Sequence, residues 1–358
     1  MFKQIYNKAK SGWRSQKKKE KDCSITVIIL SAIALALALY ELSEVMIDRS
    51  PNLQENVEIY ISGTSGYNQV IDRIVPNLKW KNSFKRKAQE RRLESNLHTG
   101  HYYFEKGLST NYLLAALKNG WQSPVKLTIA GTIRTKGELA GIISRKLMTD
   151  SLEVADNISN IYEVLPNTYQ VYWDQSAESL IQMLHEEWDR FWKSEPDFIK
   201  GISRDSIAAQ MGLSRKDIAT IASIVNQESN HTPEYERIAG VYVNRLKCGM
   251  PLQADPTIKF AIGDFTLTRI LNEHLLTDSP YNTYKYPGLP PGPICIPSIK
   301  AIDAVLNYSK EPYLYFCADP EFNGTHRFAR TLSEHSRNAA AYRQALGRLE
   351  REKRLKKS

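Results

Sequence analysis

The stretch from residue 217 to 229 holds the residues of this sequence whose types and spacing point most clearly to chemistry. Ser214 and Asp217 have the spacing of a capping box, which predicts that a helix begins here. Three apolar residues then recur at helical spacing and define one face: Ile218, Ile221 and Val225. Glu228 takes the next place on that face. A carboxylate at the end of a core-facing stripe is costly to ionise, so its pKa is expected to rise toward the range of a general acid.

Further helices are predicted on both sides of Glu228. A long helix begins at Ser176, and Thr232 followed by Pro233 indicates the N-terminus of another helix. Residues 165–250 are therefore expected to be mostly helical, with Glu228 at the break between two helices. Such a break leaves room for a ligand beside the carboxylate. The spacing alone also fits a helix that ends and lets Glu228 reach water.

Loops rich in proline, glycine, tyrosine and asparagine follow the helical region, at residues 251–256, 279–284 and 288–294. Such loops are stiff and carry flat aromatic and amide groups. Sugar rings and N-acetyl amides offer apolar faces rimmed by hydrogen-bonding groups, so these loops suit a saccharide. Any one of them alone is better explained as an ordinary surface turn.

Residues 56–150 alternate between short predicted strands and helices, a pattern that indicates small α+β modules. The expected elements are strands at 56–62 and 125–129 and helices at 67–74, 110–118 and 135–147. Residues 165–169 are expected to form a turn-rich junction. Near the end of the chain, a buried strand at Tyr313–Phe316 is expected to pair with Gly324–Phe328, before a final helix from residue 333.

The chain has 358 residues, enough for two or three domains, and its 42% hydrophobic and 24% charged content is ordinary for a folded protein. Its net charge of +9 is concentrated in two tails: residues 1–22 carry +6 and residues 347–358 carry +4, which leaves −1 for the rest. A nearly neutral body argues against a nucleic-acid-binding domain, which carries its basic residues on a folded face.

Four cysteines, Cys23, Cys248, Cys295 and Cys317, show neither a C-x-x-C pair nor the spacing of metal ligands. A disulfide between Cys295 and Cys317 would be compatible with a location outside the cytoplasm. Buried free thiols are the favoured interpretation.

Ser24–Tyr40 contain no charged side chain and directly follow the basic residues 1–22. With Cys23 and Leu42 as extensions, the run is long enough for a membrane-spanning helix. Lysines just before it predict a cytoplasmic N-terminus, so everything after about residue 45 is expected outside the inner membrane. A cleaved signal peptide is the alternative, but no small-x-small cleavage site follows the run.

A resemblance to a known family rests on seven motifs that occur in order. They are Ile221–Glu228, Val243–Leu246, Met250–Thr257, Tyr281–Tyr284, Gly288–Ile294, Tyr313–Phe316 and the Gly-x-His-x-Phe run that ends at Phe328. Together they resemble the YceG-like endolytic murein transglycosylases. Tyr103–Leu108, Leu165–Tyr169 and the single N-terminal span resemble that family as well, so the match covers residues from about 24 to 346.

The resemblance implies an α+β protein with one transmembrane helix, a LysM-like α+β region and a mainly helical catalytic domain with Pro/Gly-rich loops and a short β-hairpin. The implied domains are a cytoplasmic basic tail (1–22), a transmembrane signal anchor (23–42), the LysM-like region (45–155), the catalytic domain (160–346) and a basic C-terminal tail (347–358). The implied activity is internal cleavage of peptidoglycan glycan strands at the MurNAc–GlcNAc β-1,4 bond, which would end the elongation of nascent strands. The implied partners are peptidoglycan, the membrane and cell-wall synthases, and no nucleic acid.

The family's catalytic glutamate corresponds to Glu228 in this sequence. Many relatives have a second glutamate two residues earlier, where this chain has Asn226. Asn226 lies about 200° around the helix from Glu228, away from the apolar face. The chemistry is therefore assigned to Glu228.

A lytic transglycosylase needs one carboxylic acid, whereas ordinary glycosidases use two. Glu228 is expected to protonate the glycosidic oxygen and then to take the proton of the MurNAc C6 hydroxyl, which attacks C1 and gives a 1,6-anhydro ring. Because the substrate supplies the nucleophile, neither a metal nor a cofactor is predicted. Asp255 and His326 are favoured as structural groups within a wider set of predicted saccharide-binding residues: Ser229, Gln253, Asp255, Asn282, Tyr284 and His326.

Two alternatives stay open. A hydrolytic muramidase would use Glu228 together with Asp255. A non-enzymatic peptidoglycan-binding scaffold would use the LysM-like region as its only functional part.

Overall fold

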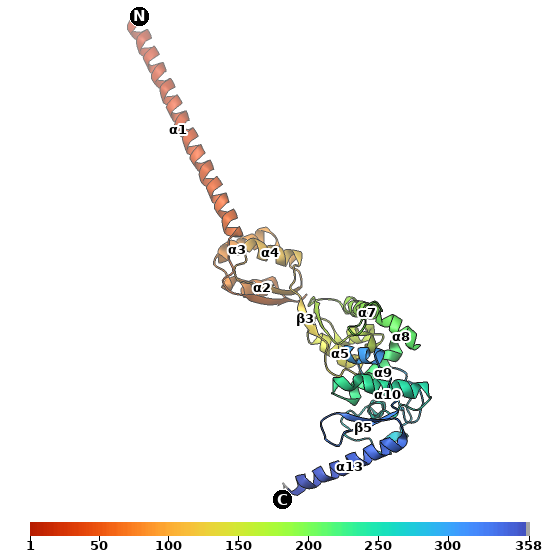
Figure 1. The fold of residues 1–358 in the computed structure, drawn as a ribbon. Coiled ribbons are helices and arrows are strands. Elements are labelled where there is room, and N and C mark those ends of the chain that lie inside the picture. The colour runs from red at the N-terminus through yellow and green to blue at the C-terminus, as the bar shows by residue number, and fades with distance from the viewer. Residues whose placement is uncertain (356–358) are drawn as a thin grey trace. The chain divides into compact units, whose positions relative to one another are not determined.

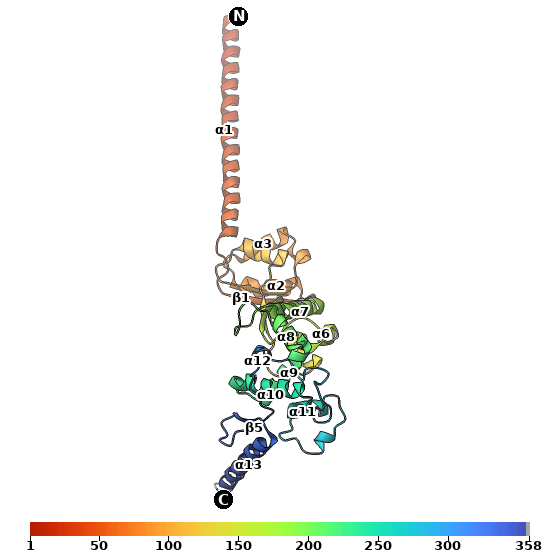
Figure 2. The ribbon, with the colours of Figure 1, turned by 45° about the vertical axis from the view of Figure 1, so that its right-hand side comes forward.

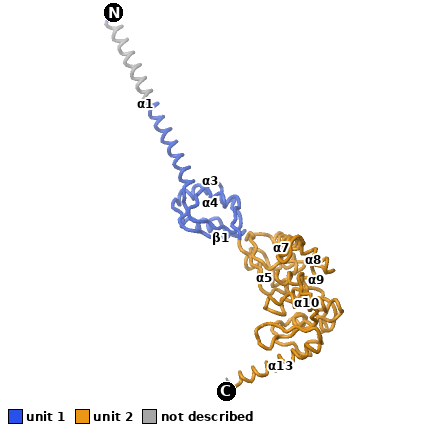
Figure 3. Tube along the Cα trace, viewed as in Figure 1, with its two compact units in different colours: residues 1–124 blue, residues 125–358 orange. Residues whose placement is uncertain are grey.

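The computed structural model describes the backbone of residues 1–355 and the side chains of all of these except residues 3–24. The charges expected on the tail at residues 1–22, the thiol of Cys23, and the last residues of the basic C-terminal tail therefore lie outside the described part. The chain divides into two compact units, residues 1–124 and residues 125–358 (Figure 3).

The first unit begins with helix α1, which runs from Phe2 to Arg49 (Figure 1). Its part from Ile25 to Arg49 contains an 18-residue window with a mean hydropathy of 2.3 and is long and apolar enough to cross a membrane. A signal sequence near an N-terminus meets the same criteria. An apolar N-terminal helix is thus confirmed, and it continues without a break beyond its expected end at residue 42.

A small α+β body follows α1. Its elements are β1 (Val57–Ile61), α2 (Tyr67–Ile74), η1 (Val75–Asn77), α3 (Lys81–Glu90), η2 (Leu93–Asn96), β2 (Gly100–Phe104) and α4 (Thr110–Asn119). The two strands pair antiparallel, with Ile59 opposite Tyr102. Apolar residues at alternate strand positions and on the helix faces share one core, in which Phe84 and Leu113 are fully buried. Gly120 takes the left-handed conformation that ends α4.

The second unit begins with another pair of strands, and two helices lie between these strands along the chain. Its elements are β3 (Val125–Thr128), α5 (Lys136–Ser144), α6 (Ser151–Asn157), η3 (Ile161–Glu163) and β4 (Thr168–Val171). Strands β3 and β4 pair antiparallel, and β4 forms where a turn-rich junction was expected. A capping box of Thr135 and Glu138 opens α5, within the helix expected at 135–147.

Residues 125–155 pack in this second unit, although the expected boundary of the α+β region lies near residue 155. Leu127 and Leu139 share a core with Leu180 and Leu184 on the long helix α7 (Ala177–Lys193). Pairing with β4 and burial against α7 therefore place these residues with the helical region that follows them.

Helix α9 is enclosed by neighbouring helices. Helix α9 spans Arg215–Glu228. Its neighbours are α8 (Arg204–Met211), α10 (Tyr235–Lys247), α11 (Asp255–Ile262) and α12 (Ile299–Leu306). Figure 2 shows α10, α11 and α12 near α9, and all four neighbours contact it. Every residue from Ile218 to Val225 is buried as a result. Ser214 and Asp217 form the predicted capping box.

The prediction that Thr232 caps the next helix is wrong. Thr232–Glu234 form the 3-10 turn η4, and α10 begins only at Tyr235. The tighter 3-10 turn around Pro233 precedes the helix, so the N-cap position of α10 falls on Glu234, which makes no side-chain cap bond. Another short 3-10 turn, η5 (His274–Leu276), lies in the loop after α11.

A hairpin and a final helix complete the chain. Strand β5 (Tyr315–Ala318) pairs antiparallel with β6 (His326–Ala329), and α13 (Leu332–Leu355) follows. The predicted hairpin forms, but β5 is half-buried rather than buried because α10 and α13 cover it incompletely. Within the described part of the chain, Cys248, Cys295 and Cys317 are free thiols, so no disulfide joins the last two. The whole is a mostly helical α+β protein with small antiparallel sheets.

Gly240 provides a test of how closely α10 packs. A Cβ atom at this position would lie 2.6 Å from the carbonyl oxygen of Ser309. We expect Gly240→Ala to destabilise the chain by about 1–3 kcal/mol, because the overpacked backbone must shift. Urea unfolding in detergent measures this change as a lower midpoint.

Gly141 on α5 is the matched control for that substitution. Its nearest neighbour would be the mobile end of the Arg145 side chain at 3.4 Å. Gly141→Ala is expected to stabilise the chain by about 0.5–1 kcal/mol, since alanine favours the helix. Equal midpoints for the two variants would contradict the close contact between α10 and Ser309.

Candidate active site

Glu228 is the last residue of α9 and lines a cavity of about 370 Å³. The wall of this cavity comes from α10, α11, the hairpin, α13 and two loops. Besides Glu228, it is lined by Tyr242, Arg245, Leu252, Gln253, Asp255, Tyr284, Phe316 and His335. The structure thus brings four of the predicted site residues together: Glu228, Gln253, Asp255 and Tyr284.

Tyr242 holds the Glu228 carboxyl group. Its hydroxyl donates a hydrogen bond of 2.6 Å to Glu228 Oε1. Burial and the charge of Glu228 raise the pKa of Tyr242 well above 10, so the phenol keeps its proton and remains a donor. The Phe316 ring packs edge-on against the Tyr242 ring, with centroids 6.0 Å apart. Because Oε1 is occupied, Oε2 is the oxygen left for a ligand.

Burial raises the pKa of Glu228 from its ordinary value of 4.5 to about 7. The hydrogen bond from Tyr242 lowers the pKa, the charge of Asp255 raises it, and the charges of Lys259 and Arg245 lower it. The direction is the one that the apolar stripe of α9 predicts. A carboxyl group with this pKa can both donate and accept a proton near neutral pH.

Arg245 is a brace for the cavity wall. It is buried, its Nε donates to the carbonyl oxygen of Leu314 at 2.7 Å, and its Nη1 donates to that of Leu252 at 2.7 Å. These bonds fasten the start of the hairpin and the loop before α11 to α10. Gln253 follows in that loop with a positive φ of 53°, and its side chain is exposed.

Asp255 and Tyr284 form a second hydrogen-bonded pair in the cavity. The Tyr284 hydroxyl donates to Asp255 Oδ1 at 2.5 Å. The Asp255 side chain is exposed, and it is the first residue of α11. The cavity therefore contains two carboxyl groups, each bonded to a tyrosine.

Asn282 lies behind the cavity wall. It is fully buried, and its amide donates to the carbonyl oxygens of Leu275 and Thr277 at 2.9 and 2.8 Å. Its Oδ1 accepts from the N–H groups of Tyr284 and Lys285 at 3.0 and 3.2 Å. This amide is occupied in holding the loop that carries Tyr284.

Ser229 and His326 also lie outside the cavity wall. The buried Ser229 hydroxyl accepts from the N–H of His231 at 2.9 Å and stabilises the turn after α9. His326 Nδ1 lies 2.9 Å from a carboxylate oxygen of the buried Glu234, and its backbone N–H donates to the other oxygen at 2.9 Å. This pair ties β6 to the turn before α10.

Five residues of the cavity are absent from the predicted site: the apolar Leu252 and Phe316, and the polar Tyr242, Arg245 and His335. Tyr242 and Arg245 share the buried face of α10 with Ile238 and Val241. Polar residues on an apolar helix face are a sequence pattern that could have identified both as site residues. The same pattern identifies Glu228 on α9. His335 comes from α13, and no local pattern connects it with α9.

Asn226 faces a different cavity, of about 430 Å³. Its Oδ1 accepts from the N–H of Ser298 at 3.0 Å. Residues 128–132 and 166–168, next to β3 and β4, form most of the wall. Asn226 and Glu228 thus face different cavities, as their angular separation on α9 predicts.

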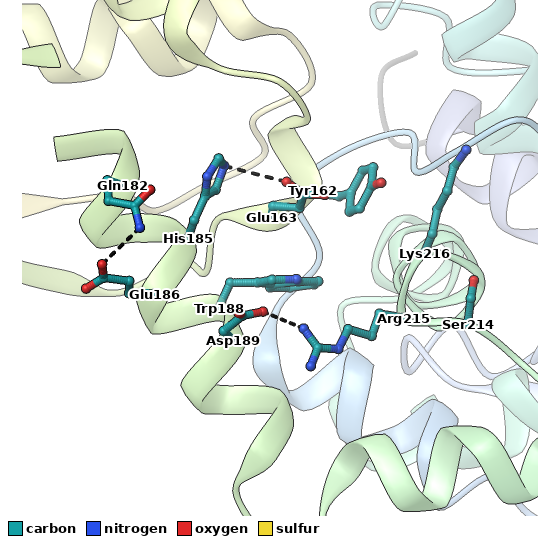
Figure 4. Close-up of a pocket in the computed structure, with 10 residues that line it drawn as sticks. All are labelled: Tyr162, Glu163, Gln182, His185, Glu186, Trp188, Asp189, Ser214, Arg215 and Lys216. Atoms are coloured by element: carbon teal, nitrogen blue, oxygen red, sulfur yellow. Dashed lines mark hydrogen bonds and ion pairs between the residues drawn. The ribbon is translucent and has the colours of Figure 1, made fainter. Parts of the chain in front are cut away.

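A further cavity, of about 520 Å³, lies at the opposite end of α9 (Figure 4). Some of its charged side chains lie close to one another: Arg215 binds Asp189 at 2.6 Å, and His185 lies 3.6 Å from Glu163. Gln182 donates to Glu186 at 2.9 Å. The Glu228 cavity is the better candidate for an active site, because it contains a carboxyl group whose pKa is raised to about 7.

Removing the Tyr242 hydroxyl is expected to raise the pKa of Glu228 above about 7, because the hydrogen bond from Tyr242 lowers it. The change is Tyr242→Phe, which keeps the ring and its contact with Phe316. Titration of the Glu228 carboxyl carbon by 13C NMR measures the shift. An unchanged or lowered pKa would show that the hydroxyl does not stabilise the carboxylate.

Comparison with known proteins places the chain in a family. It matches the model of the YceG-like family over residues 59–341. It is 42% identical over 125 residues to the endolytic murein transglycosylase of Bacillus subtilis, which covers 35% of this chain and 34% of that protein. It is 30% identical over 291 residues to the endolytic murein transglycosylase of Streptococcus pneumoniae, which covers 69% of this chain and 51% of that protein.

The chain thus spans about half the length, or less, of these curated relatives. A crystal structure of a YceG-like protein from Listeria monocytogenes is 26% identical, with a TM-score of 0.46, and the match covers 79% of this chain and 99% of that one. Because the family model matches most of the sequence, the chain belongs to the YceG-like family.

Proposed function

We propose that this chain is an endolytic lytic transglycosylase that cleaves the MurNAc–GlcNAc β-1,4 bond within peptidoglycan strands. The observation that carries the proposal is Glu228, a carboxyl group with a pKa of about 7, held by Tyr242 in a cavity. Two relatives that bear the name endolytic murein transglycosylase support it.

The proposed reaction uses one carboxyl group twice. Glu228 Oε2 donates its proton to the glycosidic oxygen, and the C1–O bond breaks as the ring gains oxocarbenium character. The resulting carboxylate accepts the proton of the C6 hydroxyl of the same MurNAc, whose oxygen attacks C1. The products are a free GlcNAc hydroxyl and a 1,6-anhydroMurNAc end, and Glu228 is protonated again.

Hydrolysis is the second candidate, because Asp255 shares the cavity with Glu228. Two carboxyl groups could direct a water molecule to C1. Product mass separates the two reactions, since hydrolysis adds one water to the new end and the anhydro product does not.

The apolar part of α1 supports a membrane anchor with a cytoplasmic N-terminus. Glu44 and Asp48 near its end form ion pairs with Arg86 and Lys87 on α3, so α1 is fastened to the α+β body that follows. We propose that this body stands next to the outer face of the cytoplasmic membrane. Cleavage there would act on strands as they leave their synthases and would end their elongation.

The LysM-like region was expected at residues 45–155, and we propose that the segment β3–α5–α6–β4, which overlaps its end, contributes to peptidoglycan binding. The cavity beside Asn226 has no charged residue in its wall, which consists of hydroxyl, amide and apolar groups from residues 128–132, 166–168, Asn226, Ile296 and Ser298. Such a wall suits an uncharged N-acetylated sugar. The N–H of Ile296 donates to the carbonyl oxygen of Ile133 at 2.8 Å and connects this segment to the catalytic region.

Glu228→Gln is expected to abolish cleavage, because the amide cannot donate the proton that the glycosidic oxygen needs. Mass analysis of muropeptides released from sacculi by the full chain measures the products. The native chain should yield anhydro ends and lose activity as the pH rises above about 7, since Glu228 must be protonated. Glu321→Gln, at an exposed hairpin position, is the control. Anhydro products from Glu228→Gln at the native rate would disprove the assignment.

Thr132→Trp tests the sugar-binding cavity. Thr132 is exposed in its wall, so an indole ring would fill the space without disturbing the core. In the Glu228→Gln background, where sacculi stay intact, the substitution should reduce the fraction of chain that pellets with them. Gln210→Trp on the exposed face of α8 is the control. Equal pelleting of the two variants would show that the cavity does not bind the wall.

A further inference from the structure

Asp255 has the features of a functional group rather than a structural one. Its Oδ1 accepts the 2.5 Å hydrogen bond from Tyr284, and within the described part of the chain its Oδ2 has no hydrogen-bond partner. The side chain is exposed to the same cavity as Glu228. A carboxylate that only capped α11 would bond to backbone N–H groups, and Asp255 makes no such bond.

The hydrogen bond from Tyr284 orients the Asp255 carboxylate. Burial and the hydrogen bond to Asp255 raise the pKa of Tyr284 strongly, so its hydroxyl stays a donor. The backbone N–H of Tyr284 is fixed by Asn282, whose own amide is fully bonded to the loop. The buried Asn282 therefore positions Tyr284, and Tyr284 positions Asp255.

The negative charge of Asp255 is not neutralised by a direct partner. Asp255 lies in the first turn of α11. Among the described residues no lysine or arginine lies within ion-pair distance of it, and Arg245 donates from Nε and Nη1 to the carbonyl oxygens of Leu314 and Leu252. The cavity thus contains one carboxyl group with a raised pKa, Glu228, and a second carboxyl group, Asp255, that is bonded to Tyr284 through Oδ1 alone among the described residues.

We propose, on the basis of the function proposed above, that Asp255 is a second catalytic residue that stabilises the positive charge of the MurNAc ring in the transition state. The ring carries this charge as the C1–O bond breaks, and a fixed negative group in a desolvated cavity favours it. Asp255 forms no bond and exchanges no proton in this step. The proton passes from Glu228 to the leaving oxygen and returns to Glu228 from the C6 hydroxyl, so the atoms balance without it.

The pH dependence of cleavage separates this role from a structural one. The groups that face Glu228 are Tyr242 and Arg245 on α10, Asp255 and Lys259 on α11, Tyr284 in its loop and His335 on α13. Of the charged ones, only Asp255 raises the pKa of Glu228. Removing its charge should therefore move the loss of activity to lower pH, whereas a folding defect would leave that pH unchanged.

The test compares Asp255→Asn, Asp255→Glu and Tyr284→Phe in the full chain, with kcat and pH profiles measured on glycan strands. Asn keeps an acceptor for Tyr284, so Asp255→Asn isolates the charge. We expect a loss in kcat of about 10²-fold, of the size seen when one charge-stabilising group is removed, and an alkaline limb at lower pH. Asp255→Glu should recover part of kcat. Tyr284→Phe should lower kcat while the alkaline limb stays in place, because the charge remains.

Two controls make the outcomes distinct. Asp197→Asn, at an exposed position away from the cavity, should match the native chain. One outcome would contradict the role of Asp255 but not the proposed function. In that outcome, Glu228→Gln is inactive and the native products are anhydro ends, but Asp255→Asn cleaves at the native rate with the native pH profile. If Glu228→Gln stays active, or the products contain added water, the proposed transglycosylase fails first. If Asp255→Asn does not fold, an unchanged kcat for Tyr284→Phe overturns the inference.

Discussion

The hydrogen bond between Tyr242 and Glu228 is the interaction on which the site depends. It joins the C-terminal end of α9 to the middle of α10. At this point each helix contributes one polar side chain to a contact that is otherwise apolar. A carboxyl group in that position must be bonded or it would destabilise the fold. Burial of α9 by four other helices fixes the position of Glu228, and Tyr242 fixes its orientation.

The remaining polar groups around the cavity have two roles: some hold the surrounding loops in place, and others are exposed where a ligand could bind. Arg245 and Asn282 are buried and use their donors on backbone carbonyl oxygens, so they hold loops in place. Asp255 and Gln253 are exposed to the cavity and have room for a ligand. Residue type alone does not separate the two groups, since Asn282 and Gln253 carry the same functional group with opposite exposure.

The helix that carries Glu228 was predictable because its signals are local: a capping box, an apolar stripe and a carboxylate at the end of the stripe. The tyrosine that holds the carboxylate was within reach by the same logic, as a polar residue on the buried face of α10. Helix α11 was missed because residues 251–256 read as a loop, although Pro256 near its start is a common helix signal. Strand β4 was missed because its partner β3 is distant in sequence. The cavity itself could not be predicted without the fold, since its lining residues come from six separate segments of the chain.

The burial of Glu228 also couples folding to proton binding. Its pKa is about 7 in the folded chain and near its ordinary 4.5 when the chain is unfolded, so the folded state holds a proton that the unfolded state releases. The stability that this proton contributes is fully present below about pH 4.5 and is lost as the pH rises through about 7. The proton that the acid donates to its substrate is therefore the same proton that helps hold the end of α9 in place. Alkaline conditions that deprotonate the acid also weaken the packing that positions it.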